Sequence, residues 1–181
     1  AELLNQAKNG DWKSIFTVSN LMQLISWLIT TFCASGFFVT LYKMKKYKIG
    51  YTTGVFDMFH IGHLNILRRA KEQCEHLIVG VSTDDVVESY KHHRPVIPFE
   101  DRIAIVKAIR YVDAVVAQES MDKFKAWENL RFDVMFHGNE WKGSEIYNRY
   151  NKKLATVGVE VVFLPHTDGI SSSMLREKND K

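Results

Sequence analysis

From Lys46 onward, apolar runs typical of strands alternate with runs in which apolar residues recur at helical spacing. The runs rich in β-branched, aromatic and apolar residues predict strands at 47–55, 76–82, 113–117, 133–138 and 159–165. Helical spacing predicts helices at 63–74, about 99–109, 121–130, about 144–157 and within 171–178. This alternation predicts a doubly wound α/β domain over residues 47–181, with a parallel, Rossmann-like sheet. Its ligand crevice should lie at the carboxyl ends of the strands.

The first 46 residues carry a different pattern. No charged residue occurs between Lys13 and Lys43, and residues 21–42 are mostly apolar. This run is long enough to cross a bilayer, and the lysines after Tyr42 would face the cytoplasm. Six Gln, Ser and Thr residues dilute the run, however, and an arm packed on protein would have the same composition. We therefore expect residues 1–46 to form an apolar helical arm or a membrane-associating segment.

Composition narrows the classes of function. The chain has 181 residues, 46% of them hydrophobic and 25% charged, which suits one domain with an appendage. A net charge of +3 without a long basic run gives no reason to expect a nucleic-acid partner. Cys33 and Cys74 have neither metal-ligand spacing nor the pattern of a disulfide framework. We expect a reducing, cytoplasmic location, with membrane association through residues 21–42 left open, and no metal site built by the protein.

The stretch GVFDMFHIGHLNIL, residues 54–67, places His60 and His63 at the predicted turn from the first strand into the first helix. The first N–H groups of a helix are unpaired and its dipole favours an anion. Gly62 has no Cβ, so a ligand could approach the backbone closely. A lone histidine beside an apolar run is usually an ordinary structural residue. The pair at this position instead predicts a phosphate-binding loop.

Further polar clusters follow other predicted strands. Lys91 and the basic residues after it fall in what we expect to be a polar loop, for which a solvated surface is the plainer interpretation. HGNEWKG follows the fourth strand, and LPHTDGISSSMLR follows the fifth. Consecutive serines at a helix start either cap the helix or form a second anion cradle. Two such cradles across one crevice indicate a nucleoside triphosphate, although both the dinucleotide fingerprint and the Walker A pattern are absent from the sequence.

HIGH, followed by HTDGISSS, resembles the paired signature of the cytidylyltransferases, a family of the nucleotidyltransferase superfamily. GVFDMFHIGH, VSTDD, IRYVDAVV, GNEWKG and LPHTDGISSS are most similar to the members that use glycerol 3-phosphate, and they extend the resemblance over about 48–177. The resemblance implies transfer of CMP from CTP to a small phosphorylated alcohol, glycerol 3-phosphate being favoured, with release of pyrophosphate. The alternatives are phosphocholine or phosphoethanolamine as acceptor, an adenylyltransferase, or a catalytically silent nucleotide-binding domain that serves a membrane partner.

The resemblance also implies roles for single residues. His60, His63 and Lys91 would be catalytic, acting on phosphate charge. Nucleotide contacts would come from Val55, Phe56, Asn139, Glu140, Trp141, His166, Thr167, Gly169, Ile170, Ser171, Ser172 and Ser173. Contacts with the acceptor substrate would come from Asp57, Lys91, Lys123 and Arg110. Mg²⁺ would accompany the triphosphate, and the segment that holds Arg110 and Asp113 would lie near the interface of a homodimer.

The sequence departs from the family pattern at two positions. His166 stands where the later signature has arginine, and Asn139 stands where a related segment has an acid. Arginine offers a fixed, charged fork of donors that histidine cannot reproduce. These departures put the acceptor and the base in question more than the reaction class.

Overall fold

The computed structural model describes residues 22–31 and 45–179. Residues 22–31 form a helix, and a compact domain begins at Lys45. Over these two described ranges, no helix combines the length and the apolar character needed to cross a membrane. Most of the predicted segment 21–42, including Cys33, lies outside the described residues.

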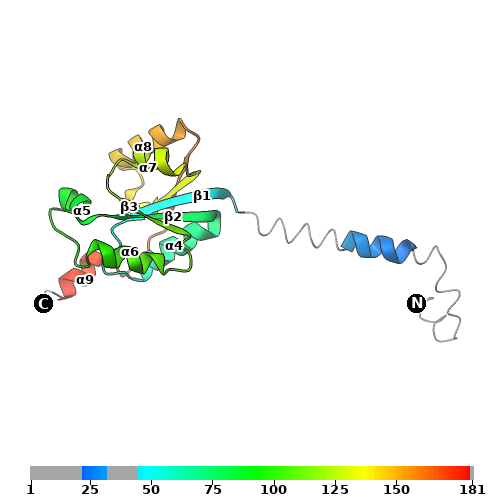
Figure 1. Cartoon of the computed structure of the whole chain (residues 1–181), viewed down its shortest axis with the longest axis horizontal. Helices are drawn as coiled ribbons and strands as arrows, with labels where there is room; N and C mark the ends of the chain where they lie inside the picture. The colour runs from blue at the N-terminus through cyan, green and yellow to red at the C-terminus, as the bar shows by residue number, and fades with distance from the viewer. Residues whose placement is uncertain (1–21, 32–44, 180–181) are drawn as a thin grey trace. The chain divides into compact units, whose positions relative to one another are not determined.

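Five parallel strands form the sheet of the domain (Figure 1). They are β1 (Tyr47–Gly54), β2 (Cys74–Ser82), β3 (Ala114–Gln118), β4 (Val134–Gly138) and β5 (Glu160–Leu164). Their order is β3-β2-β1-β4-β5, and each neighbouring pair is parallel. The order reverses between β1 and β4, and a doubly wound sheet opens its ligand crevice at such a switch point. The predicted fold class is confirmed.

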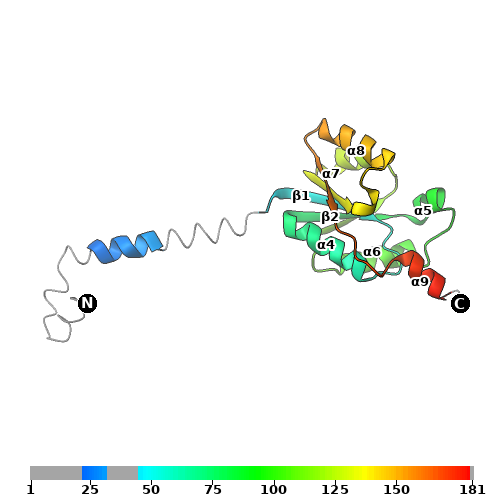
Figure 2. The ribbon, with the colours of Figure 1, turned by 180° about the vertical axis from the view of Figure 1, so that it is seen from behind.

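The helices lie on both faces of this sheet. They are α4 (Ile61–Gln73), α5 (Asp84–Lys91), α6 (Phe99–Lys107), α7 (Lys123–Leu130), α8 (Glu145–Ala155) and α9 (Ser172–Asn179), with a 3₁₀ turn, η1 (Asn139–Trp141). Helices α4 and α6 cover one face, and α7 and α8 cover the other (Figures 1 and 2). The five predicted helices are found within a few residues of their expected bounds.

Helix α5 was not predicted: we expected a polar loop over 82–102, but a loop is found only between α5 and α6, at 92–98. Thr83 is its N-cap, with its side-chain oxygen accepting from the Val86 N–H at 3.4 Å. Val87 is fully buried and anchors the helix to the domain. A capping threonine and a buried valine therefore override the polar composition of the segment.

Two apolar cores hold the sheet in place. Leu67 and Ala70 of α4 and Val106 of α6 are fully buried against one face. On the other face, Leu154 of α8 belongs to a core in which the ring of Tyr51 stacks on Phe132 at a centroid distance of 4.9 Å. Since both faces are covered, the strand ends form a fixed platform for the loops that follow them.

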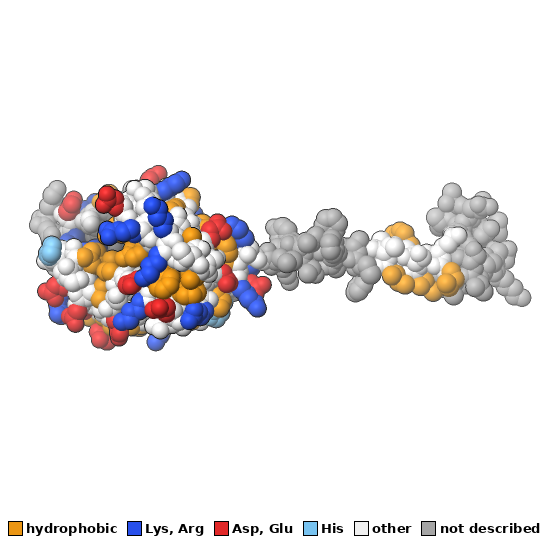
Figure 3. All heavy atoms as spheres, turned by 90° about the horizontal axis from the view of Figure 1, so that it is seen from above, with side chains coloured by type: hydrophobic (Ala, Val, Ile, Leu, Met, Phe, Trp, Pro, Cys, Tyr) orange, Lys and Arg blue, Asp and Glu red, His pale blue; other side chains and the backbone are white. Residues whose placement is uncertain are grey.

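Lys45 and Lys46 attach the start of the domain to α4 and β5. Lys45 Nζ donates to the carbonyl oxygens of Lys71 and Glu72 at the end of α4, at 3.2 and 2.8 Å. Lys46 Nζ pairs with the Glu160 carboxylate at 3.1 Å. A cation at the last carbonyls of a helix complements the helix dipole. On the face of the domain that Figure 3 shows, Lys and Arg side chains are interspersed with Asp and Glu side chains.

Candidate active site

A cavity of about 640 Å³ opens at the carboxyl ends of the strands. The ends of β1, β2, β3 and β4 line it, together with residues of α4, α5, α7, η1, α8 and α9. Its basic side chains are His63, Lys91, His93, Lys123, His137 and Arg176, and its carboxylates are Asp57 and Glu140. Its volume suits a ligand of nucleotide size, and its cations Lys91, Lys123 and Arg176 outnumber its two carboxylates, which favours an anion.

The two histidines of the HIGH stretch cap the start of α4 reciprocally. His60 Nδ1 accepts from the Gly62 N–H at 3.1 Å, and His63 Nδ1 accepts from the His60 N–H at 3.4 Å. The two rings stack with their centroids 3.9 Å apart. Because each Nδ1 accepts a hydrogen bond, each neutral ring carries its proton on Nε2. The local helix start therefore fixes the tautomer of both side chains.

Gly62 is required by the ring of His60. A Cβ at this position would lie 2.8 Å from Cε1 and 2.9 Å from Nδ1 of His60, closer than Cβ atoms approach other atoms. Only glycine lets the imidazole fold back onto the first turn of its own helix. The space that we expected a ligand to use is thus taken by His60 itself.

Burial keeps both histidines uncharged near neutral pH. It lowers the pKa of His63 to about 3, with a further lowering by the neighbouring His60. Burial also lowers the pKa of His60, helped by the charge of His166. Neutral imidazoles with Nε2 protons are fixed hydrogen-bond donors, and donors held in advance stabilise charge that develops on a phosphate.

The serines of the later signature lie beside this pair. Ser172 Oγ donates to the carbonyl oxygen of Asp57 at 2.7 Å and lies 3.5 Å from His60 Nε2. This contact holds the start of α9 against the loop that follows β1. Residues more than 100 positions apart in the sequence thereby form one polar wall.

The loop between β5 and α9 is held by two residues that we expected to bind the nucleotide. Thr167 Oγ1 accepts from Asn65 Nδ2 at 3.1 Å, which ties the loop to α4. Asn139 Oδ1 accepts from the His166 N–H at 3.2 Å, which ties it to η1. His166 Nδ1 lies 3.9 Å from Glu140 Oε2, and its side chain is about half exposed. These contacts give Asn139 and Thr167 a role in shaping the loop.

The carboxylate of Asp57 joins the α5–α6 loop to α9. This carboxylate, which is almost fully buried, accepts from the backbone N–H groups of Val96 and Ile97 at 3.0 and 2.9 Å and from Arg176 Nη2 at 3.0 Å. Burial acts to raise the pKa of Asp57, but these hydrogen bonds hold it below its ordinary value. With both oxygens engaged, Asp57 fixes the α5–α6 loop and α9 around the cavity.

Arg102 of α6 forms hydrogen bonds with the segments next to Asp57. Its side chain is fully buried, and Nη1 donates to the carbonyl oxygens of Val55 and Ser82 at 2.6 and 2.8 Å. Its Nε donates to the Ile97 carbonyl oxygen at 2.9 Å, and Nη2 pairs with Asp84. One guanidinium therefore joins the ends of β1 and β2 to the start of α5. Nothing in the sequence predicts this network, because three of the four partners of Arg102 are backbone carbonyl groups and the fourth, Asp84, lies 18 positions away.

Two lysines bring charge to the cavity from different helices. Lys91 is the last residue of α5, and burial together with the charge of Arg176 lowers its pKa. Lys123 is the first residue of α7 and is only 3% exposed, and burial lowers its pKa to about 8. Burying a cation is unfavourable without an anionic partner. The buried ammonium group of Lys123 is therefore suited to bind a phosphate, and Lys91, which is exposed, adds a second positive charge at the cavity.

The cavity gathers many of the residues predicted from the sequence. Those that line it are Val55, Phe56, Asp57, His63, Lys91, Lys123, Glu140, Trp141, Ser172 and Ser173. Those that lie in the adjoining turns without lining it are His60, Asn139, His166, Thr167, Gly169, Ile170 and Ser171.

Arg110, for which we expected a contact with the acceptor substrate, lies outside this cavity. It lies in the turn between α6 and β3, at the amino end of a strand, whereas the cavity is at the carboxyl ends. Its guanidinium lies over the ring of Tyr111, 4.9 Å from the centroid. The direction of the chain through the sheet therefore keeps Arg110 out of this cavity.

Other lining residues were not predicted. They include Tyr90, Gln118, Met121, His137, Ile146, Tyr147, Tyr150 and Arg176. Arg176 could have been found, because it follows Ser172 by four positions and so shares its face of the helix. The aromatic lining residues could not be predicted in this way, because the positions of Tyr147 and Tyr150 also fit the apolar face by which α8 packs on the sheet.

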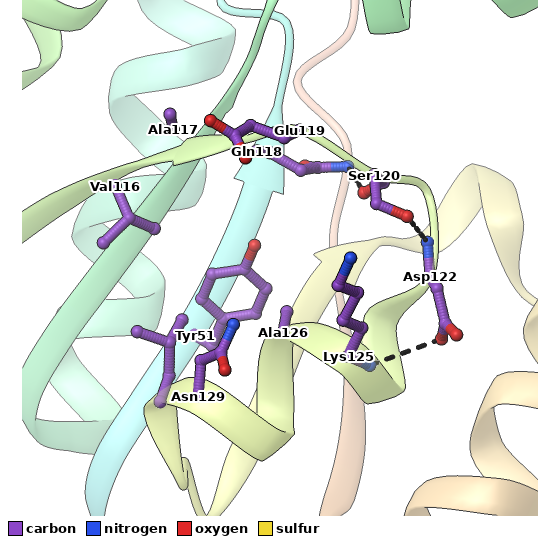
Figure 4. Close-up of a pocket in the computed structure, with 11 residues that line it drawn as sticks. Tyr51, Val116, Ala117, Gln118, Glu119, Ser120, Asp122, Lys125, Ala126 and Asn129 are labelled. Carbon is purple, nitrogen blue, oxygen red and sulfur yellow. Dashed lines mark hydrogen bonds between the residues drawn. The ribbon is translucent and has the colours of Figure 1, made fainter.

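A second, smaller cavity of about 260 Å³ lies between β3 and α7. Tyr51 and Asn129 line it, and Ser120 Oγ accepts from the Asp122 N–H at its rim (Figure 4). Gln118 lines both cavities. The smaller one contains none of the predicted site residues, so the chemistry belongs to the larger.

The sequence profile of the cytidylyltransferase-like family matches residues 51–178, which include both signatures and nearly the whole domain. The chain belongs to this family. A glycerol-3-phosphate cytidylyltransferase of Staphylococcus aureus (strain NCTC 8325 / PS 47) is 33% identical over 128 residues, covering 70% of this chain and 91% of that protein. An FAD synthase of Pyrococcus horikoshii is 40% identical over 119 residues, covering 62% of this chain and 77% of that protein.

Among solved structures, a lipopolysaccharide core biosynthesis protein from Thermoplasma volcanium GSS1 matches with a TM-score of 0.57. It is 23% identical, and the match covers 67% of this chain and 97% of that one. At this identity the similarity supports the fold alone. Membership of the family makes the chain a nucleotidyltransferase of the cytidylyltransferase kind.

Proposed function

We propose that this protein transfers CMP from CTP to a small phosphorylated alcohol, with glycerol 3-phosphate as the favoured acceptor. A phosphate oxygen of the acceptor forms a bond to the α-phosphorus of CTP while the bond from that phosphorus to the bridging oxygen of the β-phosphate breaks. The electron pair of the broken bond leaves with pyrophosphate, and the other product is a CDP-alcohol. The name of the Staphylococcus aureus relative supports this acceptor.

The observation that carries the proposal is the stacked pair of His60 and His63 beside Ser172. Phosphoryl transfer needs little covalent help from the protein and depends on positioning and charge. The two Nε2–H groups would donate to oxygens of the α-phosphate as negative charge develops there. Lys91 would hold the acceptor phosphate against the nucleotide, and Lys123 would bind the acceptor from the other side of the cavity.

Mg²⁺ would enter with the triphosphate. Within residues 22–31 and 45–179, no three His, Cys, Asp or Glu side chains are grouped to hold a metal ion. In the cavity, Asp57 is already engaged, which leaves Glu140 as the other carboxylate. Mg²⁺ commonly keeps several waters and binds through substrate phosphates. The ion would therefore arrive bound to the triphosphate, as part of the substrate.

The test is an assay of pyrophosphate release by the purified chain with Mg²⁺. CTP and ATP are each combined with glycerol 3-phosphate, phosphocholine, phosphoethanolamine and FMN. Release with CTP and glycerol 3-phosphate supports the proposal. Release only with ATP and FMN would favour adenylyl transfer, which the similarity to an FAD synthase makes the second candidate. If CTP and glycerol 3-phosphate release no pyrophosphate, the proposed acceptor is wrong, and nucleotide binding without release from any pair would favour a silent binding domain.

We also propose that the chain forms a homodimer. Arg110 is exposed on its turn, where it is available to a second copy. Asp113, in contrast, is engaged within its own protomer, because its Oδ2 accepts from the Leu77 N–H and from Lys71 Nζ, each at 2.6 Å. Light scattering after gel filtration measures the mass directly. A mass of about 21.0 kDa, the monomer, would contradict the proposal.

A further inference from the structure

Gln118 lies next to the two segments that lead to the lysines of the larger cavity. It is the last residue of β3, is only 5% exposed, and lines the larger cavity. The turn 119–122 follows β3 and leads into α7, which begins at Lys123. The neighbouring strand β2 leads into α5, which ends at Lys91. The backbone carbonyl oxygen of Gln118 accepts from the Thr83 N–H, at the start of α5, at 3.2 Å. Gln118 therefore lies where the segments before both helices meet.

The side-chain amide of Gln118 connects these two segments. Ser82 Oγ, at the end of β2, donates to Gln118 Oε1 at 3.5 Å, and Gln118 Nε2 donates to the Ser120 carbonyl oxygen at 3.1 Å. A buried amide is unfavourable unless its polar atoms are paired, and these two contacts pair both of them. Because the protein uses both polar atoms, the amide acts on a ligand through the segments that it holds.

The turn 119–122 depends on hydrogen bonds because one side of it borders a cavity. Three of its four residues line the smaller cavity of about 260 Å³, together with Gln118 (Figure 4). Atoms that face a cavity have no packing contact on that side. The turn is held by the Gln118 amide and by Tyr150 Oη, which donates to the Met121 carbonyl oxygen at 2.9 Å. The place at which α7 begins therefore depends on these polar contacts.

Lys123 follows this turn directly, so the turn decides where its side chain enters the larger cavity. Only 3% of Lys123 is exposed, and it lines that cavity. Asp122 caps α7 by accepting from the Phe124 N–H at 2.9 Å, which fixes the start of the helix. A displacement of about 1 Å at a binding group can cost about a hundredfold in rate. An amide that holds the turn can therefore control the ammonium group of Lys123 without contacting the substrate.

We propose that Gln118 is a positioning residue that holds Lys123, relative to Lys91, at the spacing that binds the phosphate of the acceptor. The proposal rests on the proposed function and adds to it a buried residue of β3 that lies outside both signatures. Gln118 contacts the end of β2 and the turn before α7 at once, so loss of its amide lets these segments shift relative to each other. The affinity for the acceptor should change, whereas the contacts of His60 and His63 with the nucleotide should not.

The experiment is steady-state kinetics of the full chain with Mg²⁺, CTP and glycerol 3-phosphate. Gln118→Met removes both hydrogen bonds of the amide and keeps a side chain of similar size. Gln73→Met is the matched control, because Gln73 Nε2 also donates to a backbone carbonyl oxygen, at 3.4 Å, but Gln73 does not line the cavity. Gln118→Met should raise the KM for glycerol 3-phosphate about tenfold and leave the KM for CTP unchanged, whereas Gln73→Met should change neither. A residue with a merely structural role would not separate the two KM values.

A double-mutant cycle tests whether Gln118 acts through Lys123. Lys123→Gln alone should raise the KM for glycerol 3-phosphate, because a charge-assisted contact with phosphate is lost. Addition of Gln118→Met to Lys123→Gln should then cause little further change, since the group that Gln118 positions is already missing. Independent effects, in which the two increases multiply, would overturn the proposal. Ser82→Ala removes only the partner of Gln118 Oε1 and serves if Gln118→Met does not fold. It should raise the same KM by a smaller factor, and an unchanged KM would overturn the proposal.

An NMR titration of ¹³C-methylated lysines tests the proposal without turnover. Burial lowers the pKa of Lys123 to about 8, so its signal should titrate near that pH and be missing from Lys123→Gln. In Gln118→Met, displacement of the side chain toward solvent should raise that pKa toward its ordinary value.

The outcomes distinguish this proposal from the proposed reaction. A raised pKa of Lys123 in Gln118→Met, in a chain that does not transfer CMP to glycerol 3-phosphate, would support the proposal and contradict the reaction. Active transfer with a wild-type KM for glycerol 3-phosphate in Gln118→Met would overturn the proposal and leave the reaction standing. An unchanged titration of Lys123 in an inactive chain would also overturn the proposal.

Discussion

His60 and His63 stack with ring centroids 3.9 Å apart, and each accepts a backbone N–H through Nδ1 at the first turn of α4. The glycine between them is the residue that allows the His60 ring to lie against the helix. The H-x-G-H spacing therefore produces two neutral donors with fixed direction. A single histidine in this turn could not supply both the reciprocal cap and the second donor.

The burial of two histidines makes stability depend on pH. The pKa of His63 and that of His137 are each lowered to about 3, against 6.5 in an unfolded chain. As the pH falls below 6.5, the unfolded chain takes up protons that the folded chain does not. The stability that these groups contribute is therefore complete above pH 6.5 and is lost progressively toward pH 3.

Urea denaturation at pH 7.5 and pH 5 measures this loss. Each buried histidine should account for about 2 kcal/mol of the difference in unfolding free energy, from about 1.4 kcal/mol per pH unit. His63→Gln should reduce the difference, and His76→Gln, at an exposed position, should not. Equal pH dependence in the wild type and His63→Gln would show that His63 is not held neutral by the fold.

Lys91 should act through its charge. Lys91→Ala should raise the KM for the substrates or lower turnover by about tenfold or more, because a charge-assisted contact with phosphate is lost. Lys91→Gln should rescue little, since it keeps the length of the side chain in part but not the charge. Steady-state kinetics with Lys107→Gln as a surface control measures both effects. Recovery of most activity in the Gln variant would mean that hydrogen bonding, not charge, is the function of Lys91.

Arg102 should be a stability residue. Arg102→Met removes a buried cation that pairs with Asp84 and donates to the carbonyl groups of Val55, Ser82 and Ile97, all of which lose this donor. Loss of one partner of a buried network typically costs about 3–5 kcal/mol. Urea denaturation at pH 7.5 should show that loss. A change below about 1 kcal/mol would mean that water replaces the guanidinium at the strand ends.

The strands and most helices were predictable because their patterns are local. Each strand is a short apolar run, and α4 and α8 carry regular apolar faces. Helix α5 was not predicted because DDVVESYK has a mainly polar composition. Its stability depends on the Thr83 cap and on the burial of Val87. Its existence changes the site, since it places Lys91 at a helix end rather than in a solvated loop.

The candidate site was predictable where the segments that follow the strands carry unusual polarity, as with His63, Lys91 and Ser172. The contacts that hold it together were not, because they join distant segments. We expected Asp57 to contact the substrate. Its carboxylate instead accepts hydrogen bonds from Val96, Ile97 and Arg176. Packing decides which side chains form hydrogen bonds with each other and so are unavailable to a ligand. The sequence alone does not show these pairings.

Removal of residues 1–44 tests the apolar segment. The domain begins at Lys45, whose contacts with α4 should survive this cut. We expect the truncated chain to keep its fold and activity. The full chain should pellet with membranes or form a larger assembly, because a mostly apolar run of this length needs a partner. If the full chain is monomeric without detergent or lipid, both expectations for residues 1–46 are wrong.

The central claim is that His60 and His63 stabilise charge on the α-phosphate during cytidylyl transfer. The most direct measurement is ³¹P NMR of CTP and glycerol 3-phosphate incubated with Mg²⁺ and the wild type, His60→Ala, His63→Ala or His76→Ala. The wild type and His76→Ala should form a CDP-alcohol and pyrophosphate at the same rate. Each of the two HIGH variants should be slower by about a hundredfold or more while remaining folded. Wild-type rates in a folded His63→Ala protein, or a wild type that forms no CDP-alcohol from any phosphorylated alcohol, would contradict the claim.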